Sequence, residues 1–90
     1  MRAAWYEKNG PAREVINVGE LPDPEPCPGE VRVCIHASGV NPSDVKRRVG
    51  NLGQAIRVPR IVPHSDGAGV IDATGDGVPK TRIGERVWLY

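Results

Sequence analysis

The chain has 90 residues, of which 39% are hydrophobic and 26% are charged, and its formal net charge is +1. This length suits one small domain, residues 1–90, with a modest core, and the balanced charge excludes the basic surface of proteins that bind nucleic acid or anionic membranes. No segment approaches the ~20 apolar residues of a membrane-spanning helix, and the N-terminus lacks the apolar region of a signal peptide, so we expect a cytoplasmic protein.

Short apolar runs separated by turn-forming residues predict a mainly β fold, since the chain holds 11 Gly and 9 Pro. Arg2 to Glu7 is expected to form a strand that ends at the Asn9-Gly10-Pro11 turn. Val15 to Leu21 fits a second strand. Pro22 to Gly29 contains four prolines and is expected to be an extended surface connection, because proline neither donates to a ladder nor continues a helix.

Glu30 to Val40 has the clearest period-two pattern in the chain and predicts a strand. One face would carry Val31, Val33, Ile35 and Ala37, and the other would carry Arg32, Cys34, His36 and Ser38.

Asn41 to Gly50 predicts a helix of about two turns. Asn41 suits the N-cap, Pro42 the first helical position, and Asp44 the first turn, where a carboxylate faces the positive end of the helix dipole. Three cations, Lys46 to Arg48, follow in the last turn before Gly50, where positive charge is favourable.

The second half of the chain is expected to be loops and strands. Gly50 to Arg60 is interpreted as a loop. Gly67 to Ile71 predicts a strand, and Thr74 to Pro79 a turn. Arg86 to Tyr90 predicts a last strand, and we expect apolar surface around Val87 and Leu89 to be uncovered, which favours association.

Two glycine- and aspartate-containing patterns imitate ligand-binding loops without meeting their requirements. Gly67-x-Gly69 lacks the third glycine of a dinucleotide fingerprint, since that position is Asp72, and small strand residues more often permit a close backbone approach. The calcium-loop start at Asp72 lacks its bidentate Glu, because the twelfth position is Ile83.

The potential metal ligands and thiols do not form a recognised motif. Cys27 and Cys34 lack Cys-x-x-Cys spacing, and we interpret Cys34 as a strand residue and Cys27 as a loop thiol. A site built from His36 and His64 with Cys34 or Asp66 is conceivable, but a hydrogen-bonded or solvated histidine is the commoner state, and we expect no metal site.

Five segments stand in the order and spacing of one family: Met1-Arg2-Ala3, Pro28-Gly29-Glu30-Val31, Ala37 to Asp44, His64 to Val70, and Gly84-Glu85-Arg86-Val87. Together they resemble the catalytic domain of the medium-chain dehydrogenase/reductases, in particular the zinc-free quinone oxidoreductase (zeta-crystallin-like) branch. Asn41 stands where zinc alcohol dehydrogenases have a ligand Cys. Ser65 and Asp66 stand where they have a ligand His and a Glu, and His64 stands where Gly is usual.

This resemblance implies a GroES-like partly open β-barrel with one short helix, truncated before the Rossmann domain that binds the nicotinamide. It implies an NADPH-dependent reductase that passes hydride to a quinone or conjugated carbonyl, without zinc, and a homo-oligomer in full-length form. The isolated chain is expected to be inactive.

The resemblance also supplies the candidate site. Asn41 would lie near the nicotinamide and substrate carbonyl, as a catalytic and cofactor-binding residue. Ser43 matches the Ser or Thr that relays a proton in the zinc enzymes. Lys46 stands where quinone oxidoreductases often have a Tyr that touches the cofactor, and it would meet a phosphate as a point charge; the alternative for the three cations is a solvated helix end.

Two other functions remain open from the sequence. One is a free-standing GroES-like binding module without activity, which docks on a partner chain or on itself. The other is a zinc alcohol dehydrogenase, which Asn41 and Ser65 disfavour.

Overall fold

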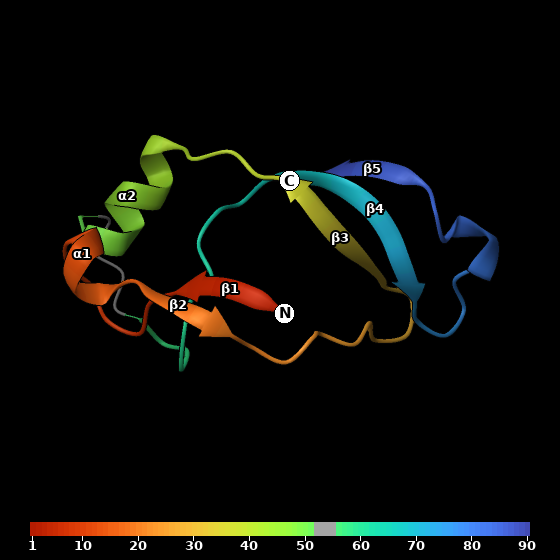
Figure 1. Ribbon diagram of the computed structural model, residues 1–90, viewed down its shortest axis with the longest axis horizontal. Helices are drawn as coiled ribbons and strands as arrows, with labels where there is room; N and C mark the ends of the chain where they lie inside the picture. The colour runs from red at the N-terminus through yellow and green to blue at the C-terminus, as the bar shows by residue number, and fades with distance from the viewer. Residues whose placement is uncertain (52–55) are drawn as a thin grey trace. The chain divides into compact units, whose positions relative to one another are not determined.

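The computed structural model describes residues 1–51 and 56–90. The chain divides into two compact units, each made of two segments. The first unit comprises Met1–Pro22 and Val40–His64, and the second comprises Asp23–Gly39 and Ser65–Tyr90. Each unit contains its own antiparallel sheet (Figure 1).

The first unit is built on a two-stranded sheet. Strand β1 (Arg2–Trp5) pairs with β2 (Asn17–Glu20) in antiparallel register. Directly after β1, Tyr6 exchanges two backbone hydrogen bonds with Ile61, of 2.9 and 2.8 Å. Tyr6 is only 1% exposed, so this extension of the sheet passes through the small core of the unit.

A second helix, which the sequence did not predict, lies between β1 and β2. Helix α1 (Ala12–Val15) is a single turn that follows Pro11, and the backbone N–H groups of Glu14 and Val15 donate to the Pro11 carbonyl. The predicted strand from Val15 to Leu21 is therefore wrong at its start, because the helical turn directs Val15 inward, where it is 5% exposed.

Helix α2 (Pro42–Val49) agrees with the sequence prediction at both ends. Asn41 is the N-cap with extended backbone, and Gly50 closes the helix with a left-handed φ of 87°. That conformation is easily adopted by glycine, which has no Cβ. Part of the loop predicted from Gly50 to Arg60, namely residues 52–55, lies outside the described residues.

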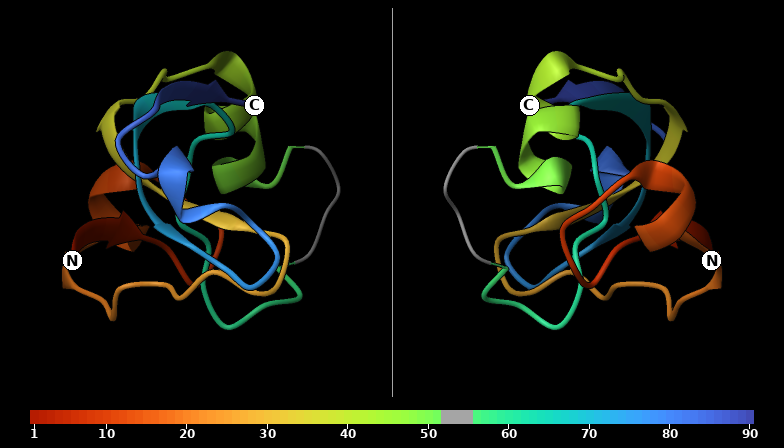
Figure 2. Two further views of the ribbon diagram at one scale, coloured as in Figure 1. Left: turned by 90° about the vertical axis from the view of Figure 1, so that its right-hand side faces the viewer. Right: turned by 90° about the vertical axis from the view of Figure 1, so that its left-hand side faces the viewer.

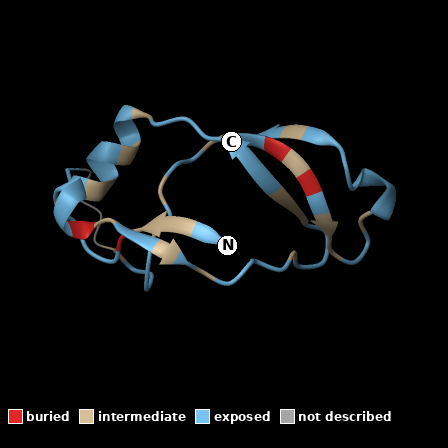
Figure 3. Ribbon diagram, viewed as in Figure 1, coloured by how far each residue is buried: buried red, intermediate tan, exposed pale blue. Residues whose placement is uncertain are grey.

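The second unit is built on a three-stranded antiparallel sheet in the order β3-β4-β5, with β3 spanning Val31–Ala37, β4 spanning Gly67–Thr74 and β5 spanning Arg86–Leu89. A 3₁₀ turn, η1 (Lys80–Arg82), lies in the connection from β4 to β5, outside the sheet (Figure 2). The buried positions of this unit lie on its central strand (Figure 3). Among them is Ile71, which is 1% exposed.

The mainly β prediction is confirmed, and each strand of the second unit overlaps a predicted one. β3 ends at Ala37, before the predicted end at Val40, and β4 continues to Thr74, beyond the predicted end at Ile71. The sequence did not predict the two register shifts between β3 and β4, between Arg32 and Val33 and between Ile35 and Ala37. Because a bulge changes the direction of the following side chains, the alternation expected from Glu30 to Val40 is interrupted at His36.

Several large apolar side chains are exposed at the end of the chain, as expected around Val87 and Leu89. Trp88 is 80% exposed and Tyr90 is 95% exposed. Among the described residues, no helix has the length and apolar character needed to cross a bilayer.

The first prediction concerns Gly69, where β4 approaches β3 most closely. A Cβ at this position would overlap the carbonyl oxygen of Cys34, so the backbone of one strand has to move. We expect Gly69→Ala to lower the free energy of unfolding by ~2 kcal/mol, measured by urea denaturation followed by circular dichroism.

Gly67→Ala is the matched control on the same strand. Its added Cβ would meet the flexible end of the Ile35 side chain at 3.1 Å and the Ala37 carbonyl oxygen at 3.4 Å, so we expect a smaller change. Equal effects of the two substitutions would contradict the assignment of the close approach to Gly69.

Candidate functional site

The three candidate residues Asn41, Ser43 and Lys46 all lie on or next to helix α2, in the first unit. Asn41 is half-buried at the N-cap. Its backbone N–H donates to the Asp44 carboxylate at 2.8 Å, and the Asp44 N–H donates to the Asn41 carbonyl at 3.0 Å. This capping-box arrangement satisfies backbone groups that a helix start otherwise leaves unpaired, and it fixes where Asn41 lies.

Ser43 and Lys46 are brought together by the helical repeat. They are three residues apart on α2, so they are neighbours on one helix face, and both are exposed. Neither side chain has a polar partner among the residues that the structure describes. Their hydroxyl and ammonium groups are therefore available to a ligand.

Hydrogen bonds from the Asn9-Gly10 turn hold the C-terminal end of α2. The Asn9 side-chain amide donates to the carbonyls of Arg47 and Arg48 at 3.0 and 3.1 Å. The Arg48 guanidinium donates in turn to the Gly10 carbonyl at 2.6 Å, and the Gly10 N–H donates to the Arg48 carbonyl at 3.0 Å. Since α2 buries none of its residues, these bonds contribute to its attachment within the unit.

The positions that correspond to the second zinc ligand and its Glu, Ser65 and Asp66, belong to the second unit. Here Asp66 has a role that the sequence did not predict. Its carboxylate accepts a hydrogen bond from the Gly39 N–H at 2.7 Å, and its carbonyl accepts one from the Ser38 hydroxyl at 3.0 Å. Asp66 therefore joins the segment after β3 to the start of β4.

The potential metal ligands named from the sequence lie at separate places among the described residues. No three His, Cys, Asp or Glu side chains come together in the ranges 1–51 and 56–90. His36 lies on β3, and His64 has a left-handed backbone with φ of 82°. Cys27 and Cys34 are both exposed free thiols.

The glycines of Gly67-x-Gly69 lie inside strand β4 of the antiparallel sheet, as the sequence interpretation expected. They do not form a turn that opens a helix, which is the geometry that holds a pyrophosphate in a Rossmann domain.

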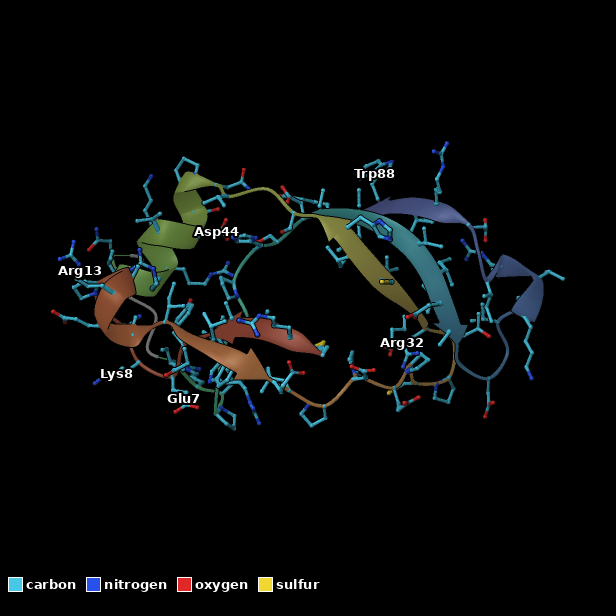
Figure 4. The ribbon with its side chains drawn as sticks, viewed as in Figure 1. Glu7, Lys8, Arg13, Arg32, Asp44 and Trp88 are labelled. Carbon is cyan, nitrogen blue, oxygen red and sulfur yellow. The ribbon has the colours of Figure 1, made fainter. Side chains whose placement is uncertain are left out.

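Arg32 fastens the proline-rich connection to the sheet of the second unit (Figure 4). Its Nε donates to the Asp72 carboxylate at 2.8 Å, and its Nη1 donates to the Pro24 carbonyl at 3.3 Å. The hydrogen bond to Asp72 raises the pKa of the Arg32 guanidinium further above its ordinary value. The sequence signal was only a charge on the polar face of β3, because the partner lies 40 residues away.

Comparison with known proteins finds consistent similarities. Residues 27–90 match the family model of the alcohol dehydrogenase GroES-like domain. Quinone oxidoreductase of Rattus norvegicus is 35% identical over 86 residues, covering 94% of this chain and 25% of the relative. Alcohol dehydrogenase of Geobacillus stearothermophilus is 34% identical over 93 residues, covering 100% of this chain and 26% of the relative.

Solved structures give the same result. The structure of a mycobacterial protein complexed with NADPH superposes with a TM-score of 0.81 and 27% identity, covering 98% of this chain and 27% of that one. The chain thus spans about a quarter of the length of the proteins it matches.

The second prediction concerns Asn9, which anchors α2. Asn9→Ala removes two hydrogen bonds to the last helical turn, each with a net contribution of about 0.5–1.5 kcal/mol. We expect amide hydrogen exchange in α2 to rise by about fivefold or more, measured by NMR or mass spectrometry. Lys8→Ala is the control on the same loop. Unchanged exchange in α2 after Asn9→Ala would show that the helix is held by other contacts.

Proposed function

The chain belongs to the alcohol dehydrogenase GroES-like domain family, in the quinone reductase-like branch of the medium-chain dehydrogenase/reductases, and we propose that it forms part of the catalytic domain of a zinc-independent NADPH:quinone or enone reductase. Proteins that resemble the chain include quinone oxidoreductases and an alcohol dehydrogenase, which supports an oxidoreductase. The observation that carries the finer proposal is Asn41 at the N-cap of α2, where the zinc enzymes have a ligand thiolate.

Asn41 has a role in this proposal that follows from its fixed position. The capping box with Asp44 holds its backbone, and its side-chain amide contains both a donor and an acceptor. Such a group orients a carbonyl by hydrogen bonding, which contributes to catalysis through positioning and electrostatics. An amide oxygen is a poor substitute for the zinc-binding thiolate, which supports a reaction without zinc.

Ser43 and Lys46 are proposed to act from the exposed face of α2. The Ser43 hydroxyl, or a water that it holds, would supply the proton that the substrate oxygen needs after reduction. The Lys46 ammonium would bind a cofactor phosphate as a point charge. When bound, the reduced nicotinamide supplies the hydride.

The cofactor is proposed to bind mainly on sequence outside these 90 residues, because no described segment forms the glycine-rich turn at a helix N-terminus. We further propose that the enzyme is cytoplasmic and homo-oligomeric.

The third prediction is that the 90-residue chain alone neither oxidises NADPH with a quinone nor binds NADPH saturably. We expect a flat titration when NADPH or NADH is added and the protein amide resonances are followed by NMR. Turnover by the isolated chain would contradict the proposed division of the cofactor site. Saturable binding that Lys46→Met weakens, and that Lys8→Met does not, would place a larger share of that site on α2.

The fourth prediction tests the activity with the protein that contains this chain together with the rest of its reading frame. We expect NADPH oxidation at 340 nm with 1,4-naphthoquinone or an enone, and a kcat about tenfold or more lower in Asn41→Ala, by analogy with the loss of one transition-state hydrogen bond. Ser43→Ala is expected to lower kcat and to change the solvent isotope effect, while Lys8→Ala leaves both unchanged. The absence of oxidation with quinones and enones, or stoichiometric zinc in the active protein, would refute the proposal.

A free-standing binding module is the second candidate, and the exposure of Trp88 and Tyr90 favours it. The two functions differ in the coding DNA after Tyr90. An in-frame glycine-rich βαβ segment supports the reductase, and a stop codon supports the module.

A further inference from the structure

A surface hollow of about 510 Å³ lies on the β3–β4–β5 sheet. Its volume falls in the range of small-molecule sites, ~300–1,000 Å³. All of its lining residues belong to the second unit: His36, Ala37, Ala68, Gly69, Val70, Arg86, Val87 and Trp88. None of them is Asn41, Ser43 or Lys46, which belong to the first unit.

The hollow follows from unequal side-chain sizes on neighbouring strands. The central strand β4 contributes Ala68, Gly69 and Val70, whereas the outer strand β5 contributes Arg86 and Trp88. Ala68 is directly opposite Trp88, and Val70 is directly opposite Arg86. Because residues two apart on a strand share a face, the guanidinium and the indole stand next to each other above a low, apolar floor.

The polar side chains around this hollow have no polar partners among the described residues. His36, Arg86 and Trp88 make no side-chain hydrogen bond or ion pair with the residues that the structure describes, and none of the eight lining residues is acidic. The nearest acidic residue in sequence, Glu85, is paired with Arg82 at 2.6 Å. The hollow therefore combines the positive charge of Arg86 with the indole of Trp88, which is 80% exposed. Figure 4 labels Trp88 on β5.

We propose that this hollow binds a planar aromatic carboxylate. The guanidinium of Arg86 is suited to a carboxylate, which it can contact with two parallel N–H donors. The Trp88 indole is suited to an aromatic ring, since offset or edge-to-face stacking adds to the burial of apolar area. His36 offers a further hydrogen-bonding group from the opposite strand.

The positive charge of Arg86 disfavours a second copy of the chain as the occupant of the hollow. Two such faces brought together would place Arg86 close to the Arg86 of the other copy with no carboxylate between them, and like charges that meet at an interface are costly. A ligand that carries both an aromatic ring and a negative charge satisfies both features of the hollow.

The test uses the indole N–H resonances of the chain's two tryptophans in ¹⁵N–¹H NMR spectra. Trp88 lines the hollow, and Trp5 lies on β1 in the first unit, so Trp5 is an internal control. We expect 2-naphthoate to shift the Trp88 resonance saturably and to leave Trp5 in place. The uncharged 2-naphthylmethanol is expected to bind about tenfold more weakly, the equivalent of ~1.4 kcal/mol.

Substitution and salt separate the two features of the proposal. Arg86→Met is expected to raise the Kd for 2-naphthoate about tenfold, and Arg13→Met, an exposed arginine of the first unit, is the matched control. Raising the NaCl concentration is expected to weaken 2-naphthoate and not 2-naphthylmethanol, because salt screens an exposed ion pair, and this comparison needs no variant.

Three results would overturn the proposal. They are equal binding of the acid and the alcohol, equal effects of Arg86→Met and Arg13→Met, and a Trp88 resonance that moves with protein concentration alone, which would show that a second copy covers the hollow. None of these results bears on reductase activity, so the two proposals fail separately.

Discussion

The second unit depends on the close backbone contact between β3 and β4. β4 is the central strand of the sheet, so it has to approach the strands on both sides. A Cβ at Gly69 would overlap the Cys34 carbonyl oxygen, and a Cβ at Gly75 would overlap the Cys27 carbonyl oxygen. Gly69 lies within β4, and Gly75 directly follows the last residue of that strand. They set the distance at which β3 and the proline-rich connection pack, and the polar contacts from Arg32 and Asp66 form at that distance.

The sequence predicted the parts of the fold that depend on local chemistry. The period-two run before Val40 became β3, and the Asn41-Pro42-Ser43-Asp44 segment became a capped helix, because alternation and capping are decided by neighbours in the chain. The bulges in β3 and the Arg32–Asp72 pair were not predictable, since each needs the register of a strand that lies tens of residues away. Helix α1 was missed because its one turn is stabilised by the burial of Val15, whose neighbours in sequence favour a strand.

The candidate site was predicted from positions that correspond to those of a known family, and not from periodicity or charge pattern. Nothing in the periodicity distinguishes Asn41 from an ordinary N-cap, and its proposed role rests on the resemblance of the segments around it. The backbone of His64 gives a physical reason for one feature of that resemblance. Its φ of 82° is left-handed, a conformation that costs a residue with a side chain ~1–2 kcal/mol. This explains why glycine suits the position.

The groups that hold helix α2 in place are not the polar side chains that are available to a ligand. Its C-terminal end is held by Asn9, Gly10 and Arg48, while Ser43 and Lys46 have no polar partner among the described residues. The attaching bonds are made by backbone carbonyls of the last turn and by the Arg48 guanidinium, so the side chains of Ser43 and Lys46 are not needed to hold the helix. A helix without buried residues would ordinarily fray, but α2 is fixed at its last turn by Asn9 and Arg48 and at its first turn by the capping box. The side chains of Ser43 and Lys46 stay accessible, which suits a helix that contacts a ligand.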